Sequence, residues 1–167
     1  QEEPRGPVFI ALPIDVMEAE TDIAATVAGP IYAATAADPV GIAAAAKLVL
    51  AASHPVIIAG DDAALGDASP SVVNLAERTG AAVWVEPVRN QASFPTSHVW
   101  AQGGLPLNAG DMRRLLADAD LIILIGGRAP EELWFEDGPC FPIGAKVVQI
   151  EAAPSCVAFS FPVDVGL

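Results

Sequence analysis

Cysteine and histidine are scarce in this chain of 167 residues. The two cysteines, Cys140 and Cys156, form no CxxC pair and are too few for a disulfide framework. With only two histidines, a zinc site built from Cys and His side chains is almost excluded. This pattern favours a reducing environment, and we expect a cytoplasmic location.

Basic residues are also few, with eight Lys and Arg against 21 Asp and Glu and a formal net charge of −13. Without a basic stripe to release counterions, the sequence excludes nucleic acid and anionic membranes as natural partners. The apolar runs Ile42–Ala46 and Leu121–Ile125 are far too short to span a bilayer, and no basic segment precedes an apolar one at the start, so no secretory signal is expected. Since 53% of the residues are hydrophobic and 17% are charged, a folded domain with a substantial core is expected.

The first part of the chain differs from the rest. Residues Gly6–Pro13 form an apolar run closed by proline, which predicts a buried strand. The stretch from Glu18 to Asp38 shows almost no periodicity and contains Gly29-Pro30, which indicates a connector. A strand followed by a long linker is what the tail of a preceding domain would look like, so we expect a piece of a larger protein.

From Asp38 onward, short apolar runs alternate with helical patterns. Helices are predicted from the cap Asp38 through Ala52 and from Ser69-Pro70 to Gly80, and a third carries apolar residues at Met112, Leu115, Leu116 and Ala119. Strands are predicted over residues 55–59, 82–85, 121–125 and 146–150, and a loop between Val85 and Gly110. This alternation predicts a Rossmann-like α/β domain with three layers, in which helices flank a mainly parallel sheet.

Five segments in this order resemble one family: Arg5–Val16, Ala45–Gly60, Ala76–Val85, Phe94–His98 and Ala119–Arg128. They are similar to the central domain of thiamine-diphosphate-dependent enzymes. The stretches AERTGAAVWVEP, FPTSH and GLP are most similar to the benzoylformate-decarboxylase-like branch, and acetolactate synthases are more distant.

The resemblance implies a parallel sheet of about six strands. It assigns residues 1–37 to the end of a pyrimidine-binding domain and its linker, and residues 38–167 to the central domain. It also implies a parent that contains a diphosphate-binding domain, forms a homodimer or homotetramer, and uses thiamine diphosphate and Mg²⁺. The family's activating glutamate and its GDG…N motif are missing here, because Gly60-Asp61 is followed by Asp62 and no Asn occurs at the family's spacing. We therefore expect no decarboxylation by this chain alone.

A further departure from the family lies after the strand LIILI. Counting without a gap from Gly126 places Leu133 where benzoylformate decarboxylases carry an active-site histidine. The resemblance thus implies an apolar wall of a substrate pocket, formed by Leu133, Trp134 and Phe135, in place of an acid–base group.

Gly126, Gly127 and Arg128 end a strand, where open α/β sheets bind ligands. Some relatives hold FAD or an adenine nucleotide such as ADP at such strand ends, and Arg128 could pair with a phosphate. A tight turn with a surface arginine explains the same residues. Because Asp61 and Asp62 would repel a diphosphate, we interpret the sequence as having lost nucleotide binding, with a stand-alone nucleotide- or FAD-binding module as the alternative function.

The remaining polar candidates favour structural roles. His54 is expected in a loop, His98 to support a Pro-rich loop, and Cys140 has no base near it in the sequence. The cluster of Glu131, Glu132, Glu136 and Asp137 follows no metal-ligand spacing and predicts a solvated acidic loop.

Overall fold

The computed structural model describes residues 7, 9–24, 36–128 and 133–167. The chain divides into two compact units, Gln1–Ala36 and Ala37–Leu167. In the first unit, the only element in the described residues is the short helix α1, Ile14–Glu18. Within the described part of the chain, no helix is long and apolar enough to cross a membrane.

The buried strand predicted near the start is wrong for residues 9–12, which are neither in a strand nor buried. The side chain of Phe9 is 93% exposed. A strand needs a hydrogen-bonding neighbour, and no described residue pairs with this segment. Of the predicted connector, residues 19–24 carry no helix or strand, and residues 25–35 lie outside the described residues. The assignment of residues 1–37 to a preceding domain stays a prediction.

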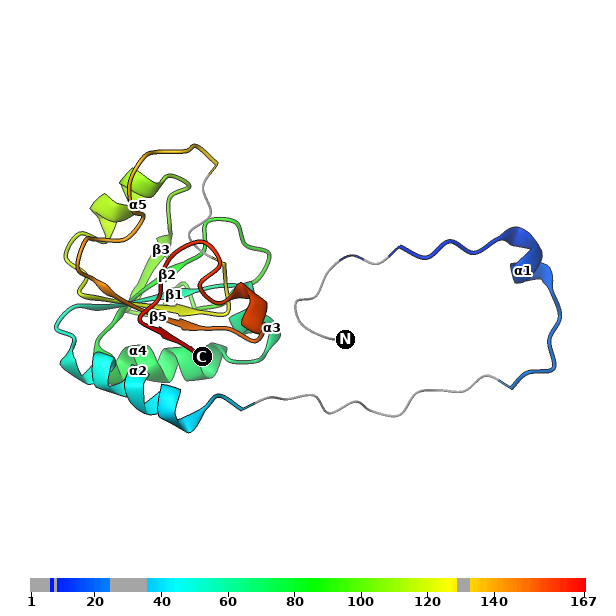
Figure 1. Ribbon diagram of the computed structural model, residues 1–167, viewed down its shortest axis with the longest axis horizontal. Coiled ribbons are helices and arrows are strands. Elements are labelled where there is room, and N and C mark those ends of the chain that lie inside the picture. Colours follow the sequence, from blue (N-terminus) through cyan, green and yellow to red (C-terminus); the bar gives the residue numbers. More distant parts are fainter. Residues whose placement is uncertain (1–6, 8, 25–35, 129–132) are drawn as a thin grey trace. The chain divides into compact units, whose positions relative to one another are not determined.

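The second unit is built on a six-stranded parallel sheet with the strand order β3-β2-β1-β4-β5-β6 (Figure 1). The strands are β1 Pro55–Ala59, β2 Ala82–Val85, β3 Ala101–Gly104, β4 Leu121–Ile125, β5 Lys146–Ile150 and β6 Val165–Gly166. The helices of this unit are α2 Pro39–Ala51, α3 Asp61–Leu65, α4 Ser69–Thr79 and α5 Ala109–Leu115, with a 3₁₀ turn at Pro154–Cys156. The predicted parallel sheet and Rossmann-like class are confirmed.

Helices α2 and α4 lie on one face of the sheet and α5 on the other (Figure 1). On the first face, Ala45 of α2 and Ala76 of α4 pack against β-sheet residues such as Ile57 and Ile123. On the second face, Met112 of α5 packs with Ile58 and Ile122. Successive residues of each central strand point to opposite faces, and both faces are covered, which explains why PVIIA and LIILI are continuous apolar runs.

The two long helices begin and end where their sequences predict. The carboxylate of Asp38 accepts a hydrogen bond from the backbone N–H of Val40 (2.7 Å), with Pro39 in the first turn. Gly80 ends α4 with φ 67°, a left-handed conformation that glycine adopts without strain.

Three local predictions are wrong. The loop predicted at Gly60-Asp61-Asp62-Ala63 instead begins the helix α3, and the predicted loop between Val85 and Gly110 contains β3 at the sheet edge. The third helix ends at Leu115, which is 44% exposed, whereas the pattern placed Leu115 on the buried side and continued to Ala119. Each of these segments is too short, or too rich in glycine, for its periodicity to be read from the sequence.

Candidate functional site: the carboxyl edge of the sheet

The strand order reverses direction between β1 and β4, which is the point where open α/β sheets place their ligand crevice. Gly60 follows β1 at this point, and Gly126, Gly127 and Arg128 follow β4. The predicted cofactor-binding residues therefore do lie at the switch point of the sheet, beyond the carboxyl ends of two neighbouring parallel strands.

Backbone hydrogen bonds fix this turn tightly. Gly126 accepts a hydrogen bond from the backbone N–H of Asp62 (2.8 Å) and donates to the carbonyl of Ile150 (2.9 Å). Its φ is 62°, and a Cβ atom at this position would overlap the backbone nitrogen of Ala63. Glycine is therefore required here by the close approach of α3 as well as by the backbone conformation.

The crevice is filled by a carboxylate from this chain. Glu86, the residue after β2, is only 5% exposed. A Cβ atom on Gly60 would lie 2.5 Å from Oε2 of Glu86, and a Cβ atom on Gly127 would overlap the same carboxylate. The glycines thus make room for the Glu86 side chain in the place where a nucleotide phosphate would have to approach.

A second carboxylate, Glu151, follows β5 at the same edge. Its Oε1 accepts a hydrogen bond from the N–H of Ala152 (3.1 Å), and its Oε2 is buried with no hydrogen-bond partner among the described residues. Partial burial and then the negative charge of Asp62 raise the pKa of Glu151 to about 6, although the charge of Arg128 works in the opposite direction. The charge of Arg128 therefore already interacts with the Glu151 carboxylate.

These carboxylates make the crevice unsuitable for a diphosphate. Asp62, Glu86 and Glu151 together place carboxylates around the turn that carries Arg128, and Arg89 donates to the backbone carbonyl of Glu86 nearby (3.2 Å). Nothing in this geometry supports the alternative of a stand-alone nucleotide- or FAD-binding module. Sequence analysis did not predict Glu86 or Glu151 as residues of this edge, although Glu86 lies within the motif AERTGAAVWVEP. The two residues come together only because of the order of the strands in the sheet.

Asp61 has a structural role that the sequence did not reveal. Its carboxylate accepts hydrogen bonds from the backbone N–H groups of Asn90 (2.8 Å) and Gln91 (3.0 Å). The buried Ser93 hydroxyl donates to the carbonyl of Ala59 (3.2 Å) a few residues later. The loop after β2 is therefore attached to the end of β1 at two points.

The predicted substrate-pocket residues lie beyond the turn. Residues 129–132, which include Glu131 and Glu132, lie outside the described residues. Leu133 donates a backbone hydrogen bond to Leu107 (3.1 Å), and its side chain is 65% exposed. Trp134 and Phe135 are 66% and 86% exposed, so three consecutive large apolar side chains project from the chain without cover. The described residues do not close a pocket around them.

The other polar candidates, His54 and His98, do not lie at the carboxyl edge of the sheet. His98 Nε2 lies 3.3 Å from Oε1 of Glu77, and the His98 ring meets the buried Phe94 edge-on at 5.1 Å. The backbone N–H of His54 donates to Asp120 (2.9 Å) at the opposite edge of the sheet. In the described part of the chain, no three His, Cys, Asp or Glu side chains are grouped so that they could hold a metal ion.

Comparisons with known proteins assign the chain to a family. The model for the central domain of thiamine pyrophosphate enzymes matches residues 42–167. The chain belongs to this family. Benzoylformate decarboxylase of Pseudomonas aeruginosa is 29% identical over 153 residues, covering 90% of this chain and 29% of the relative.

Two further similarities support this family assignment. Sulfoacetaldehyde acetyltransferase of Alcaligenes xylosoxydans xylosoxydans is 37% identical over 128 residues, covering 74% of this chain and 21% of that protein. The crystal structure of benzoylformate decarboxylase from Polynucleobacter necessarius superposes with a TM-score of 0.83 at 28% identity, over 99% of this chain and 30% of that one. The chain therefore spans less than a third of the length of these relatives, and its central-domain character and likeness to benzoylformate decarboxylases are confirmed.

Thiamine diphosphate and Mg²⁺, which the family implies, do not fit the described residues. Glu86 fills the crevice at the switch point, and the described carboxylates form no metal-ligand group. Among the described residues we therefore assign no site for either group, and no catalytic step is derived through them.

Proposed function

We propose that this chain is the central domain of a longer thiamine-diphosphate-dependent 2-oxo-acid decarboxylase or carboligase. In that protein it provides packing surface and one wall of the substrate pocket, and it does not catalyse a reaction alone. The parent would hold thiamine diphosphate and Mg²⁺ in its pyrimidine-binding and diphosphate-binding domains. It would act as a cytoplasmic homodimer or homotetramer.

The observation that carries this proposal is the exposed apolar segment after β4. Leu133, Trp134 and Phe135 follow the carboxyl end of the sheet, where α/β proteins place their functional loops. Three adjacent exposed apolar side chains form an apolar surface, which supports the proposal that another part of the working protein covers it.

An apolar wall also fits the chemistry of the substrate. A hydrophobic pocket binds the side chain of a 2-oxo acid and excludes water from the reacting carbon. Leu133 cannot exchange a proton, so acid–base work at this position would have to come from another domain. The sulfoacetaldehyde acetyltransferase relatives are a reason to test acyl transfer beside decarboxylation.

The test uses the full gene product with thiamine diphosphate and Mg²⁺. We expect CO₂ release from one or more aryl or alkyl 2-oxo acids by the full protein and none by residues 1–167. Trp134→Ala should raise KM for the substrate while leaving the affinity for thiamine diphosphate unchanged, and Val99→Ala, at another exposed apolar site, should change neither. A gene that encodes no thiamine-diphosphate-binding domains beside this one would refute the proposal, as would unchanged kinetics of Trp134→Ala.

A further inference from the structure

A cavity of about 320 Å³ opens at the amino edge of the sheet, at the opposite end of the strands from the carboxylate cluster. It lies on the face that carries α5. That helix has seven residues, whereas α2 and α4 on the other face have 13 and 11, so the second face is less completely covered. The lining residues that matter here are Val56, Trp84, Gln102, Leu116 and Asp118.

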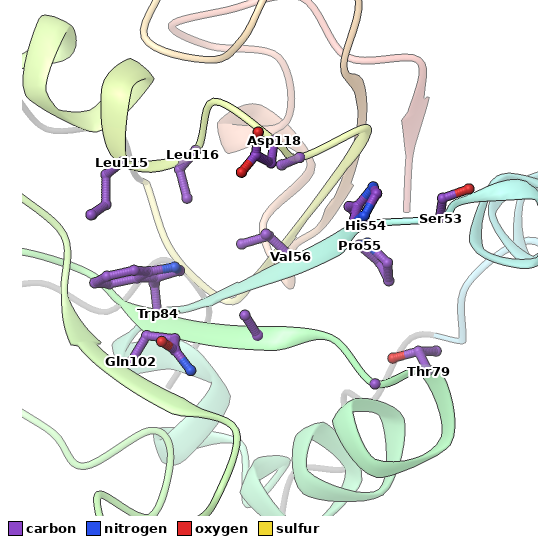
Figure 2. Close-up of a pocket in the computed structure, with 13 residues that line it drawn as sticks. Ser53, His54, Pro55, Val56, Thr79, Trp84, Gln102, Leu115, Leu116 and Asp118 are labelled. Carbon is purple, nitrogen blue, oxygen red and sulfur yellow. The ribbon is translucent and has the colours of Figure 1, made fainter.

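Part of the wall of this cavity is apolar, and it includes one aromatic ring. Figure 2 shows the indole of Trp84 on β2 on one side of the opening and Leu115 and Leu116 on the other, with Val56 of β1 at the centre. An indole face between aliphatic side chains is a platform on which a second flat ring can stack. Because an apolar cavity of ~150 Å³ holds a benzene ring, this one has room for one or two fused rings.

The polar groups around the cavity indicate which charged or polar groups a bound molecule would carry. Within the described residues, neither the indole N–H of Trp84 nor the carboxylate of Asp118 has a hydrogen-bond or ion-pair partner. Gln102 donates through Nε2 to the carbonyl of Trp100 (3.4 Å), which leaves its Oε1 available as an acceptor. The other polar side chains of the lining are those of Ser53, His54 and Thr79, and the only acidic one is that of Asp118.

We propose that this cavity binds a small aromatic amine, with its ring against Trp84 and its ammonium group toward Asp118. The net charge of −13 favours a cation over an anion of the same shape. The site is separate from the carboxyl edge, where the substrate wall is proposed, so a ligand bound here would be an accessory one and not the substrate.

The probe pair is tryptamine and indole-3-propionate, which share a ring and linker length and differ in charge. The chain has three tryptophans, so ¹⁵N-labelled protein gives three indole N–H resonances, and Trp84→Phe identifies that of Trp84. We expect tryptamine to shift the Trp84 resonance in a saturable way and indole-3-propionate to bind more weakly. The resonance of Trp134, at the other edge of the sheet, is the internal control.

Two variants separate the ring contact from the charge. Asp118→Asn should weaken tryptamine binding about two- to fivefold, as expected for a partly exposed ion pair, without changing indole-3-propionate binding in the same direction. Trp84→Leu should abolish binding of both probes, followed through the backbone resonances of Gln102 and Leu116. The proposal is overturned if tryptamine at ~10 mM, the weak end of specific binding, leaves Trp84 unshifted. Equal binding of both probes, or shifts confined to Trp134, would overturn it as well.

Discussion

The carboxylate of Glu86 lies directly against the backbone of Gly127, so that a Cβ atom at residue 127 would force the Glu86 side chain to shift. Glu86 comes from the end of β2 and Gly127 from the turn after β4, and the two residues meet above the end of β1. This contact joins three strands at the switch point and closes the crevice in which other proteins of this architecture bind nucleotides.

Gly127→Ala should test this contact. The added methyl group collides with the Glu86 carboxylate, and overpacking of this kind costs about 1–3 kcal/mol of unfolding free energy. Urea denaturation measures the loss. In a Glu86→Ala background the same substitution should cost much less, because the colliding group is gone. An equal cost in both backgrounds would show that the two residues do not interact.

Glu151 should make stability depend on pH between about 4.5 and 6. Its folded-state pKa is raised, so the folded protein binds the proton more tightly, and stability rises as pH falls through the folded pKa and levels off below the unfolded one. At pH 7.5 Glu151→Gln should stabilise the protein by at most about 1 kcal/mol, since the side chain is only half-buried and solvent screens the effect.

The measurement is the urea midpoint of the wild type and Glu151→Gln at pH 4.5 and 7.5. The gain should be present at pH 7.5 and almost absent at pH 4.5. Asp120 and Asp164 have pKa values lowered by hydrogen bonds, from Ser53 and from Lys146 respectively, and both stay ionised through this range. A gain of the same size at both pH values would contradict a role for the Glu151 proton.

Asp120 should matter for stability far more than its neighbour Asp118. The Asp120 carboxylate accepts hydrogen bonds from the backbone N–H groups of Ser53 (2.6 Å) and His54 (2.9 Å), which orients the entry into β1. Asp120→Ala should cost about 1–2 kcal/mol. Asp118→Ala should stay within about 0.5 kcal/mol, because the Asp118 carboxylate accepts no hydrogen bond from the described residues. Thermal unfolding of the two variants side by side provides the comparison.

The apolar segment after β4 should make the chain self-associate when it is produced without covering domains. We expect concentration-dependent association by light scattering and binding of a hydrophobic dye. Trp134→Ser should reduce both, because it interrupts three adjacent exposed apolar side chains. Val99→Ser, at a site that is 81% exposed, should have little effect. Equal effects of the two substitutions would mean that the segment is not a distinct surface.

Much of the fold could be predicted because local signals agree with the packing. The cap Asp38 with Pro39, and Gly80 at the end of α4, mark helix ends by backbone chemistry alone. By contrast, β3 has the sequence AQGG, with Gly103 at φ 107°, and it is a strand only because β2 lies beside it. The strand predicted within Gly6–Pro13 was wrong because an apolar run without a neighbouring strand cannot form a sheet.

The sequence predicted where Gly126, Gly127 and Arg128 lie in the fold, and a ligand-binding role for them stays a prediction. Gly126, Gly127 and Arg128 could be placed at the edge of the sheet because they follow the clearest strand in the sequence. That Glu86 would occupy the space above Gly127 could not be predicted, since the two residues are far apart in the chain and meet through the order of the strands. The roles of Leu133 and Trp134 in a substrate pocket stay predictions, because the described residues form no pocket around these side chains.

The position of β1 and β4 at the centre of the sheet has a consequence for motion. Each is hydrogen-bonded to a strand on both sides, and residues such as Ile57 and Ile122 are fully buried. Their amide protons should therefore exchange with solvent only on global unfolding, while those of β3 and β6 at the edges exchange through local opening. The turn at Gly126 therefore follows a strand whose amide protons should exchange most slowly. Side chains in the loop after this turn can then be substituted without destabilising the sheet.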